Sequence, residues 1–128
     1  MKTKQKTILG KDISFNRKVL ESKDTEILIL NHKSGRDTLK QRESGLNQVL
    51  CKIAKDNNIT LAINLKELTE EKDKKIKALL LSRIIQNINL IKKYKNSFKL
   101  LNCKNKQQGF SFLISLGLDT NQAKKSVS

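Results

Sequence analysis

The sequence predicts an α/β fold of about four strand-and-helix units arranged around a parallel sheet. Short apolar runs typical of strands alternate with longer segments in which apolar residues recur at helical spacing. No hairpin turn signal lies between these runs, which favours parallel strands joined by helices. The chain has no Pro and no long Gly-rich or Ser-rich linker, so we expect one domain over residues 1–128.

The first part of the chain predicts two strands and one helix. Residues 7–9 form a short apolar run, and residues 26–30 form a continuous one, as expected for a buried parallel strand. Residues 16–21 between them predict a helix with Asn16 as its N-cap. The polar segment 32–41 predicts an exposed connection.

The middle of the chain predicts a helix, a third strand and the longest helix. The second helix follows Asn47, residues 60–64 form the third strand, and Thr69 with the acids after it predicts the start of the long helix. The apolar stripe of this helix is formed by Ile76, Leu80, Ile84, Ile88 and Ile91. Its outer face is predicted to carry Lys74, Lys75, Arg83, Lys92 and Lys93.

The last part of the chain predicts a fourth strand and two short helices. The strand covers residues 99–103, and an apolar helix covers residues 110–116. Thr120 is a possible cap for a final helical turn over residues 121–126.

The charge predicts a polyanionic partner. The sequence holds 27 Lys and Arg against 12 Asp and Glu, a formal net charge of +15. Such a field attracts phosphates but reads no base sequence. The alternative is a Lys-rich compositional background, since only four of the basic residues are Arg. Residues 1–6 predict a disordered basic tail. No apolar run is long enough for a membrane span or signal segment, so we expect a cytoplasmic protein with no membrane partner.

Residues suited to catalysis are scarce. His32 is the single histidine, and one histidine cannot supply the three protein ligands that a catalytic metal needs. Glu67 and the acids after it are expected to serve the start of the long helix. Cys51 and Cys103 have no metal or disulfide spacing and are expected to be reduced. We therefore predict no catalytic site and no metal or cofactor bound by the protein.

The polar run before the second helix is a candidate binding site. Arg42, Ser44 and Asn47, with Gly45 between them, could place donors at a helix N-terminus, where anions bind. The alternative is a helix cap with a glycine turn. Both interpretations stay open from the residues alone.

The long helix carries the second candidate site. Arg83, Lys92 and Lys93 could form a surface that faces RNA or a protein partner, or a solvated basic face. Asn87 lies near the apolar stripe and could instead make a structural hydrogen bond.

Three segments in the same order resemble ribonuclease P protein component 3, the archaeal and eukaryotic subunit. They are Arg42-Glu43-Ser44-Gly45-Leu46-Asn47, Arg83-Ile84-Ile85-Gln86-Asn87 leading into Lys93-Tyr94, and Phe112-Leu113-Ile114-Ser115-Leu116-Gly117-Leu118 before Ala123-Lys124. The resemblance covers the C-terminal half of that family. After the fourth strand the chain departs from it, because Lys104 to Gly109 lacks the family's charged signature.

This resemblance implies a TIM-barrel-like fold truncated to about half a barrel, since a full barrel takes about 250 residues. It also implies a ribonuclease P subunit with ribonuclease P RNA, precursor tRNA and component 2 as partners. In that family the RNA cleaves the 5′ leader of precursor tRNA, and magnesium is expected for the RNA. A second chain or a self-dimer is expected to cover the open edges. The alternative is a general basic RNA-binding or ribosome-binding protein with no part in tRNA processing.

Overall fold

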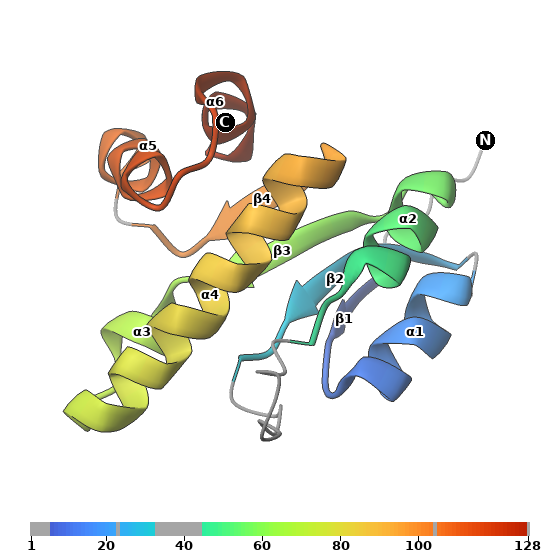
Figure 1. The fold of residues 1–128 in the computed structure, drawn as a ribbon, viewed down its shortest axis with the longest axis horizontal. Helices are drawn as coiled ribbons and strands as arrows, with labels where there is room; N and C mark the ends of the chain where they lie inside the picture. Colours follow the sequence, from blue (N-terminus) through green and yellow to red (C-terminus); the bar gives the residue numbers. More distant parts are fainter. Residues whose placement is uncertain (1–5, 23, 33–44, 104, 128) are drawn as a thin grey trace.

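The computed structural model describes residues 6–22, 24–32, 45–103 and 105–127, and these form a parallel sheet flanked by helices (Figure 1). The strands are β1 Lys6–Leu9, β2 Thr25–Leu30, β3 Thr60–Asn64 and β4 Phe98–Leu101, hydrogen-bonded in the order β1-β2-β3-β4. The helices are α1 Ile13–Glu21, α2 Gln48–Asp56, α3 Lys66–Thr69, α4 Lys74–Tyr94, α5 Lys106–Ser115 and α6 Thr120–Ser126. The predicted α/β fold of four parallel strands with flanking helices is confirmed.

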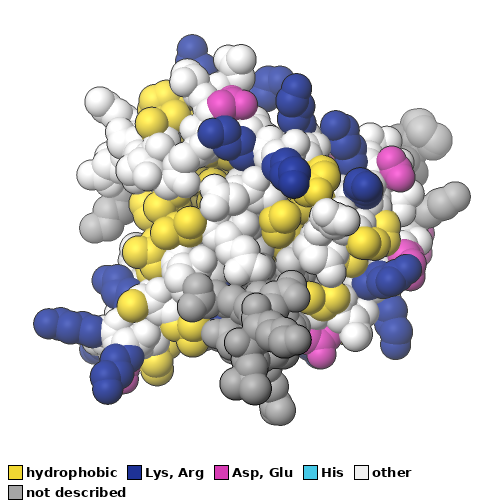
Figure 2. Space-filling model, viewed as in Figure 1, with side chains coloured by type: hydrophobic (Ala, Val, Ile, Leu, Met, Phe, Trp, Pro, Cys, Tyr) yellow, Lys and Arg dark blue, Asp and Glu magenta, His cyan; other side chains and the backbone are white. Residues whose placement is uncertain are grey.

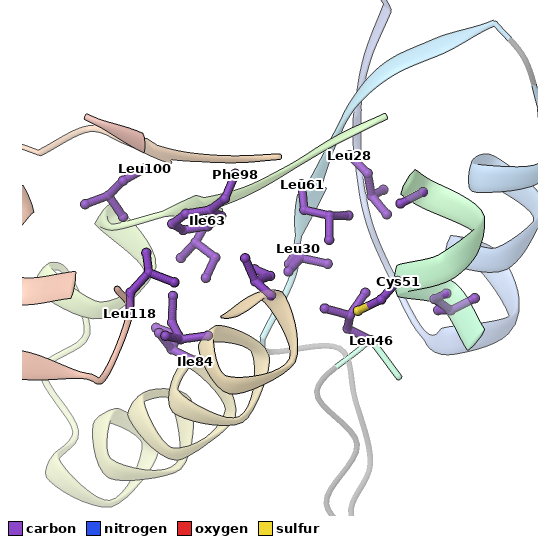
Figure 3. Close-up of a cluster of buried hydrophobic side chains, with 14 of the residues drawn as sticks. Leu28, Leu30, Leu46, Cys51, Leu61, Ile63, Ile84, Phe98, Leu100 and Leu118 are labelled. Atoms are coloured by element: carbon purple, nitrogen blue, oxygen red, sulfur yellow. The ribbon is translucent and has the colours of Figure 1, made fainter. Parts of the chain in front are cut away.

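The core lies between one face of the sheet and the helices. Leu28, Leu61 and Phe98 are in register on neighbouring strands and point toward the helices. Leu118 packs on the same side beside Ile84 (Figure 3). Because side chains alternate along a strand, the residues between these ones point to the opposite face.

The predicted boundaries of the fourth strand, the N-terminal tail and the last helix are wrong by one or two residues. The fourth strand covers Phe98–Leu101, and Asn102 after it adopts a left-handed φ of 62° that ends the extended run. Lys6, expected in a disordered tail, is the first residue of β1, and residues 1–5 lie outside the described part. The last helix begins at Thr120 after an Asp119 cap, so Thr120 is not the cap.

The first helix begins earlier than predicted. Asp12 is the N-cap of α1, and its side chain accepts a hydrogen bond of 2.9 Å from the backbone N–H of Phe15. Asn16 is therefore inside the helix, where it is fully buried. Its amide bridges two backbone segments, because Oδ1 accepts from Lys11 N and Nδ2 donates to Gly45 O.

The longest helix begins five residues later than Thr69. Thr69 instead ends α3, a short helix that was not predicted, and Asp73 caps α4 by accepting from the N–H groups of Lys75 and Ile76. Ile76 is 43% exposed, so the predicted stripe does not reach the core in this first turn. Figure 1 shows why, since this end of α4 extends past the sheet beside α3.

No helix in the described residues is long and apolar enough to cross a membrane.

Candidate nucleic-acid interface

The entrance to α2 is built by a glycine turn and a cap. Asn47 has an extended backbone, and its Oδ1 accepts a hydrogen bond of 2.9 Å from Leu50 N. Gly45 adopts a φ of 84°, and a Cβ at this position would lie 3.1 Å from the amide nitrogen of Asn16. Only glycine adopts this conformation without strain. Asn47 therefore has the capping role, while Arg42 and Ser44 lie outside the described residues.

Arg83 and Asn87 are buried, contrary to the prediction that Arg83 lies on the outer face of the long helix. Arg83 is 4% exposed and Asn87 is fully buried. They lie on the same helical stripe as Ile84 and Ile88, because residues three and four apart share a face. Their placement as partner-binding residues stays a prediction, but both side chains lie in the interior of the described chain.

These two side chains converge on His32, which is also fully buried (Figure 1 shows α3 and α4 at this end of the sheet). Arg83 Nη1 donates to the backbone carbonyl of His32 at 2.6 Å, and Asn87 Nδ2 lies 3.0 Å from His32 Nε2. Glu67 completes the cluster, since its Oε1 lies 2.7 Å from His32 Nδ1 and its Oε2 accepts from His32 N at 2.9 Å. We call these four residues the histidine cluster.

The histidine cluster fastens three elements together. It joins His32, the second residue after β2, to α3 through Glu67 and to α4 through Arg83 and Asn87. Its donors and acceptors suit an imidazole that donates from Nδ1 and accepts at Nε2. A completely buried imidazole cannot reach a substrate in this state. No three His, Cys, Asp or Glu side chains are grouped to hold a metal in the described residues.

A groove between α2 and α4 brings together two of the predicted site residues, Asn47 and Lys93. It encloses about 460 Å³. Its walls also include Leu46, Gln48, Gln86, Asn89 and Leu90. Two leucines, four amide side chains and one lysine therefore line it, and the amides and the lysine can donate hydrogen bonds to phosphate, ribose or peptide oxygens.

Seven exposed lysines belong to the C-terminal end of α4 and to α2 and α6. We define the basic surface as Lys52 and Lys55 of α2, Lys92 and Lys93 of α4, Lys95, and Lys124 and Lys125 of α6, all of them exposed. Figure 2 shows several lysine and arginine side chains over the upper part of the molecule, and a separate group at the lower left. Of the predicted site residues, Lys92 and Lys93 belong to it. Sequence reasoning missed the other five because they come from three separate segments.

Hydrogen bonds hold the three segments of the basic surface in place. Lys55 Nζ donates to Tyr94 O at 3.3 Å, and Tyr94 Oη donates to Gln48 Oε1 at 3.0 Å, which ties α2 to the end of α4. Gln122 Nε2 donates to Ile91 O at 3.1 Å, which ties α6 to the same end. The helices that carry these lysines are therefore fixed relative to one another.

A second groove adjoins the basic surface at the start of β4. It encloses about 770 Å³ and is lined partly by Lys95, Lys99 and Lys125. Two acids, Glu26 and Asp119, also line it, so its charge is mixed. Lys95 and Lys125 belong both to this groove and to the basic surface.

The fold and the surface define a class of protein: an incomplete parallel α/β barrel with a lysine-rich face suited to phosphates. No protein-family model matches the chain. Ribonuclease P protein component 3 of Methanococcus vannielii is 33% identical over 87 residues, which cover 68% of this chain and 35% of that protein. A chain in the cryo-EM structure of an archaeal ribonuclease P with mature tRNA matches with a TM-score of 0.74 and 25% identity, over 93% of this chain and 51% of that one.

These comparisons confirm the resemblance drawn from the three sequence segments. This chain is a relative of ribonuclease P protein component 3. It spans about half the length of the structural relative, and the aligned region is about a third of the curated one.

Proposed function

We propose that this chain works as a protein subunit of ribonuclease P, the complex that removes the 5′ leader of precursor tRNA. The relationship to component 3 carries this proposal, and the structural relative comes from an archaeal ribonuclease P bound to mature tRNA. The chain's part is to bind and support the RNA, with component 2 as a protein partner. Hydrolysis belongs to the RNA and its magnesium.

The basic surface is the part of the chain that contacts RNA in this proposal. Its seven lysines lie on a scaffold fixed by hydrogen bonds, and each lysine that meets a phosphate releases a counterion. Neutralising phosphates allows RNA segments to pack closely. The histidine cluster contributes only indirectly, by fixing α4 on the sheet.

The test compares two lysine pairs on the same helix. Lys92→Ala with Lys93→Ala removes two charges from the basic surface, and Lys74→Ala with Lys75→Ala removes two exposed charges from the opposite end of α4. The two pairs lie 18 residues apart, or about 27 Å along a helix. Total charge changes equally in both variants. A difference between their RNA affinities therefore depends on where the two lysines lie on α4.

We expect the first pair to weaken binding of ribonuclease P RNA and to flatten the slope of log affinity against log salt by about 1 to 2. The second pair should leave the slope within error of the unmodified chain. Equal slopes for both variants would place the RNA surface elsewhere.

Isolation of the tagged chain from its own cells then tests the biological role. One structured RNA and cleavage of precursor tRNA at the mature 5′ end are expected in the eluate. Diverse RNA with no cleavage would favour a general basic RNA-binding or ribosome-binding protein instead.

A further inference from the structure

The groove between α2 and α4 offers hydrogen-bond donors to a ligand. Asn47 Oδ1 already accepts from Leu50 N at 2.9 Å, and Gln48 Oε1 accepts from Tyr94 Oη at 3.0 Å. Within the described residues, no hydrogen bond engages the NH₂ group of either amide. Lys93 adds an ammonium group, which can only donate. These three side chains therefore favour a ligand that supplies acceptors.

The rest of the lining suits a flat, apolar ring. Leu46 is 2% exposed and Leu90 is half-buried, so two leucines form the apolar part of the groove. Its 460 Å³ fall within the range of about 300–1,000 Å³ that is usual for small-molecule sites. No Asp or Glu is among the described residues that line it. A ligand with apolar faces and an acceptor-rich edge matches this combination.

An unpaired nucleobase has these properties, and the surroundings favour RNA over an acidic protein segment. Proteins read RNA sequence mainly from unpaired bases, which they hold by stacking on their faces and by hydrogen bonds to their edges. Lys93 belongs both to the groove and to the basic surface, so phosphates beside the groove meet a lysine. An acidic side chain would use the donors but has no flat face to cover Leu46 and Leu90.

The donors also distinguish between the two purines. Guanine presents two neighbouring acceptors, O6 and N7, whereas adenine has the donor N6 in place of O6. We propose that the groove binds an unpaired guanine of the RNA, whose O6 and N7 accept from the side-chain amides of Asn47 and Gln48. A neighbouring phosphate pairs with Lys93. This inference deepens the proposed function and rests on it, since it names the part of the RNA that is held beside the basic surface.

The test measures the affinity of the chain for short cytidine RNAs of about five nucleotides that differ only in the central base. That base is guanine, hypoxanthine (as inosine) or adenine. Hypoxanthine keeps O6 and N7 of guanine but lacks its exocyclic amine, so it isolates the two acceptors. The flanking cytosines carry the donor N4 at the corresponding edge and compete poorly for the groove. Fluorescence anisotropy at one fixed salt concentration gives each affinity.

Two glutamine substitutions form a matched pair of variants. Gln48→Glu replaces the NH₂ group in the groove by a carboxylate oxygen and keeps an acceptor for Tyr94 Oη. Gln107→Glu makes the same change of charge in the first turn of α5. Both glutamines are exposed and lie in the first turn of their helices, so both variants should fold as the unmodified chain does, which circular dichroism checks.

We expect the unmodified chain to bind the guanine and hypoxanthine RNAs about tenfold more tightly than the adenine RNA. Gln48→Glu should remove this preference, because its carboxylate repels O6 and accepts from N6 of adenine. Gln107→Glu should retain the preference. Equal affinities for the three RNAs, no measurable binding of any of them, or a preference that survives in Gln48→Glu would overturn the inference.

An acidic peptide of equal charge is the competitor that tests for a protein ligand. If it displaces the guanine RNA as well as that RNA displaces itself, the inference is overturned in favour of a protein segment. Failure of the proposed function has a different result, because substitution of Lys92 and Lys93 would then leave the salt dependence of ribonuclease P RNA binding unchanged. If that salt dependence changes but no guanine preference is found, this inference is wrong and the proposed function stands.

Discussion

Replacing Arg83 tests whether this residue serves the fold or the RNA. Its guanidinium donates to the carbonyl of His32 at 2.6 Å, and the side chain is 4% exposed. A hydrogen bond to a charged group contributes about 1.5–3 kcal/mol, and truncation leaves the buried carbonyl without this donor. The buried methylenes add about 0.8 kcal/mol each. We therefore expect Arg83→Ala to lower the free energy of unfolding by about 3 kcal/mol.

Urea unfolding followed by circular dichroism measures this change. Lys93→Ala on the same helix is the control, and as an exposed substitution it should alter stability by less than about 0.5 kcal/mol. Arg83→Met retains most of the stem and separates packing from the hydrogen bond. A loss of under about 1 kcal/mol in Arg83→Ala, together with a fall in RNA affinity, would show instead that the guanidinium acts at a surface.

Two further predictions concern α2. Asn47→Ala removes the cap bond to Leu50 N and should destabilise the protein by about 1 kcal/mol in the same urea assay, whereas Asn47→Asp, which keeps the acceptor, should change it little. Burial raises the pKa of the Cys51 thiol to about 12, so the reactive thiolate is scarce at neutral pH. In a Cys103→Ser chain, a thiol reagent at pH 7 should label Cys51 only after denaturation; labelling at the rate of a small exposed thiol would contradict the buried placement.

The fold could be predicted from local signals because each strand and most helices have their own apolar pattern. The runs ending at Leu30 and Asn64 need no distant information, since a continuous or alternating apolar run already indicates a strand. The errors arose where two local signals competed. Asp12 and Asn16 are both good caps, and the buried bond from Asn16 to Gly45, 29 residues away, decides which one lies inside the helix.

The candidate site was less predictable because its bonds join distant parts of the chain. Arg83 and Asn87 bond to His32 across 51 and 55 positions. The polarity of these two side chains favours a position at the surface. Their spacing on the helix places them beside Ile84 and favours a position in the core. A polar residue on an apolar stripe requires a buried partner, and the sequence does not show which residue supplies it.

The two sides of α4 have different roles. The buried side belongs to the histidine cluster, and the exposed side carries lysines of the basic surface. The resemblance to component 3 includes Arg83 and Asn87, yet both side chains face inward and hold the helix on the sheet. Lys92 and Lys93 are exposed, so their substitution should leave the core undisturbed, and the proposed function predicts that it lowers the RNA affinity. A family resemblance at Arg83 is thus evidence for a shared way of positioning α4. In the proposed function, RNA binding depends on the lysines at the C-terminal end of α4, so stability and salt dependence should respond to different substitutions on one helix.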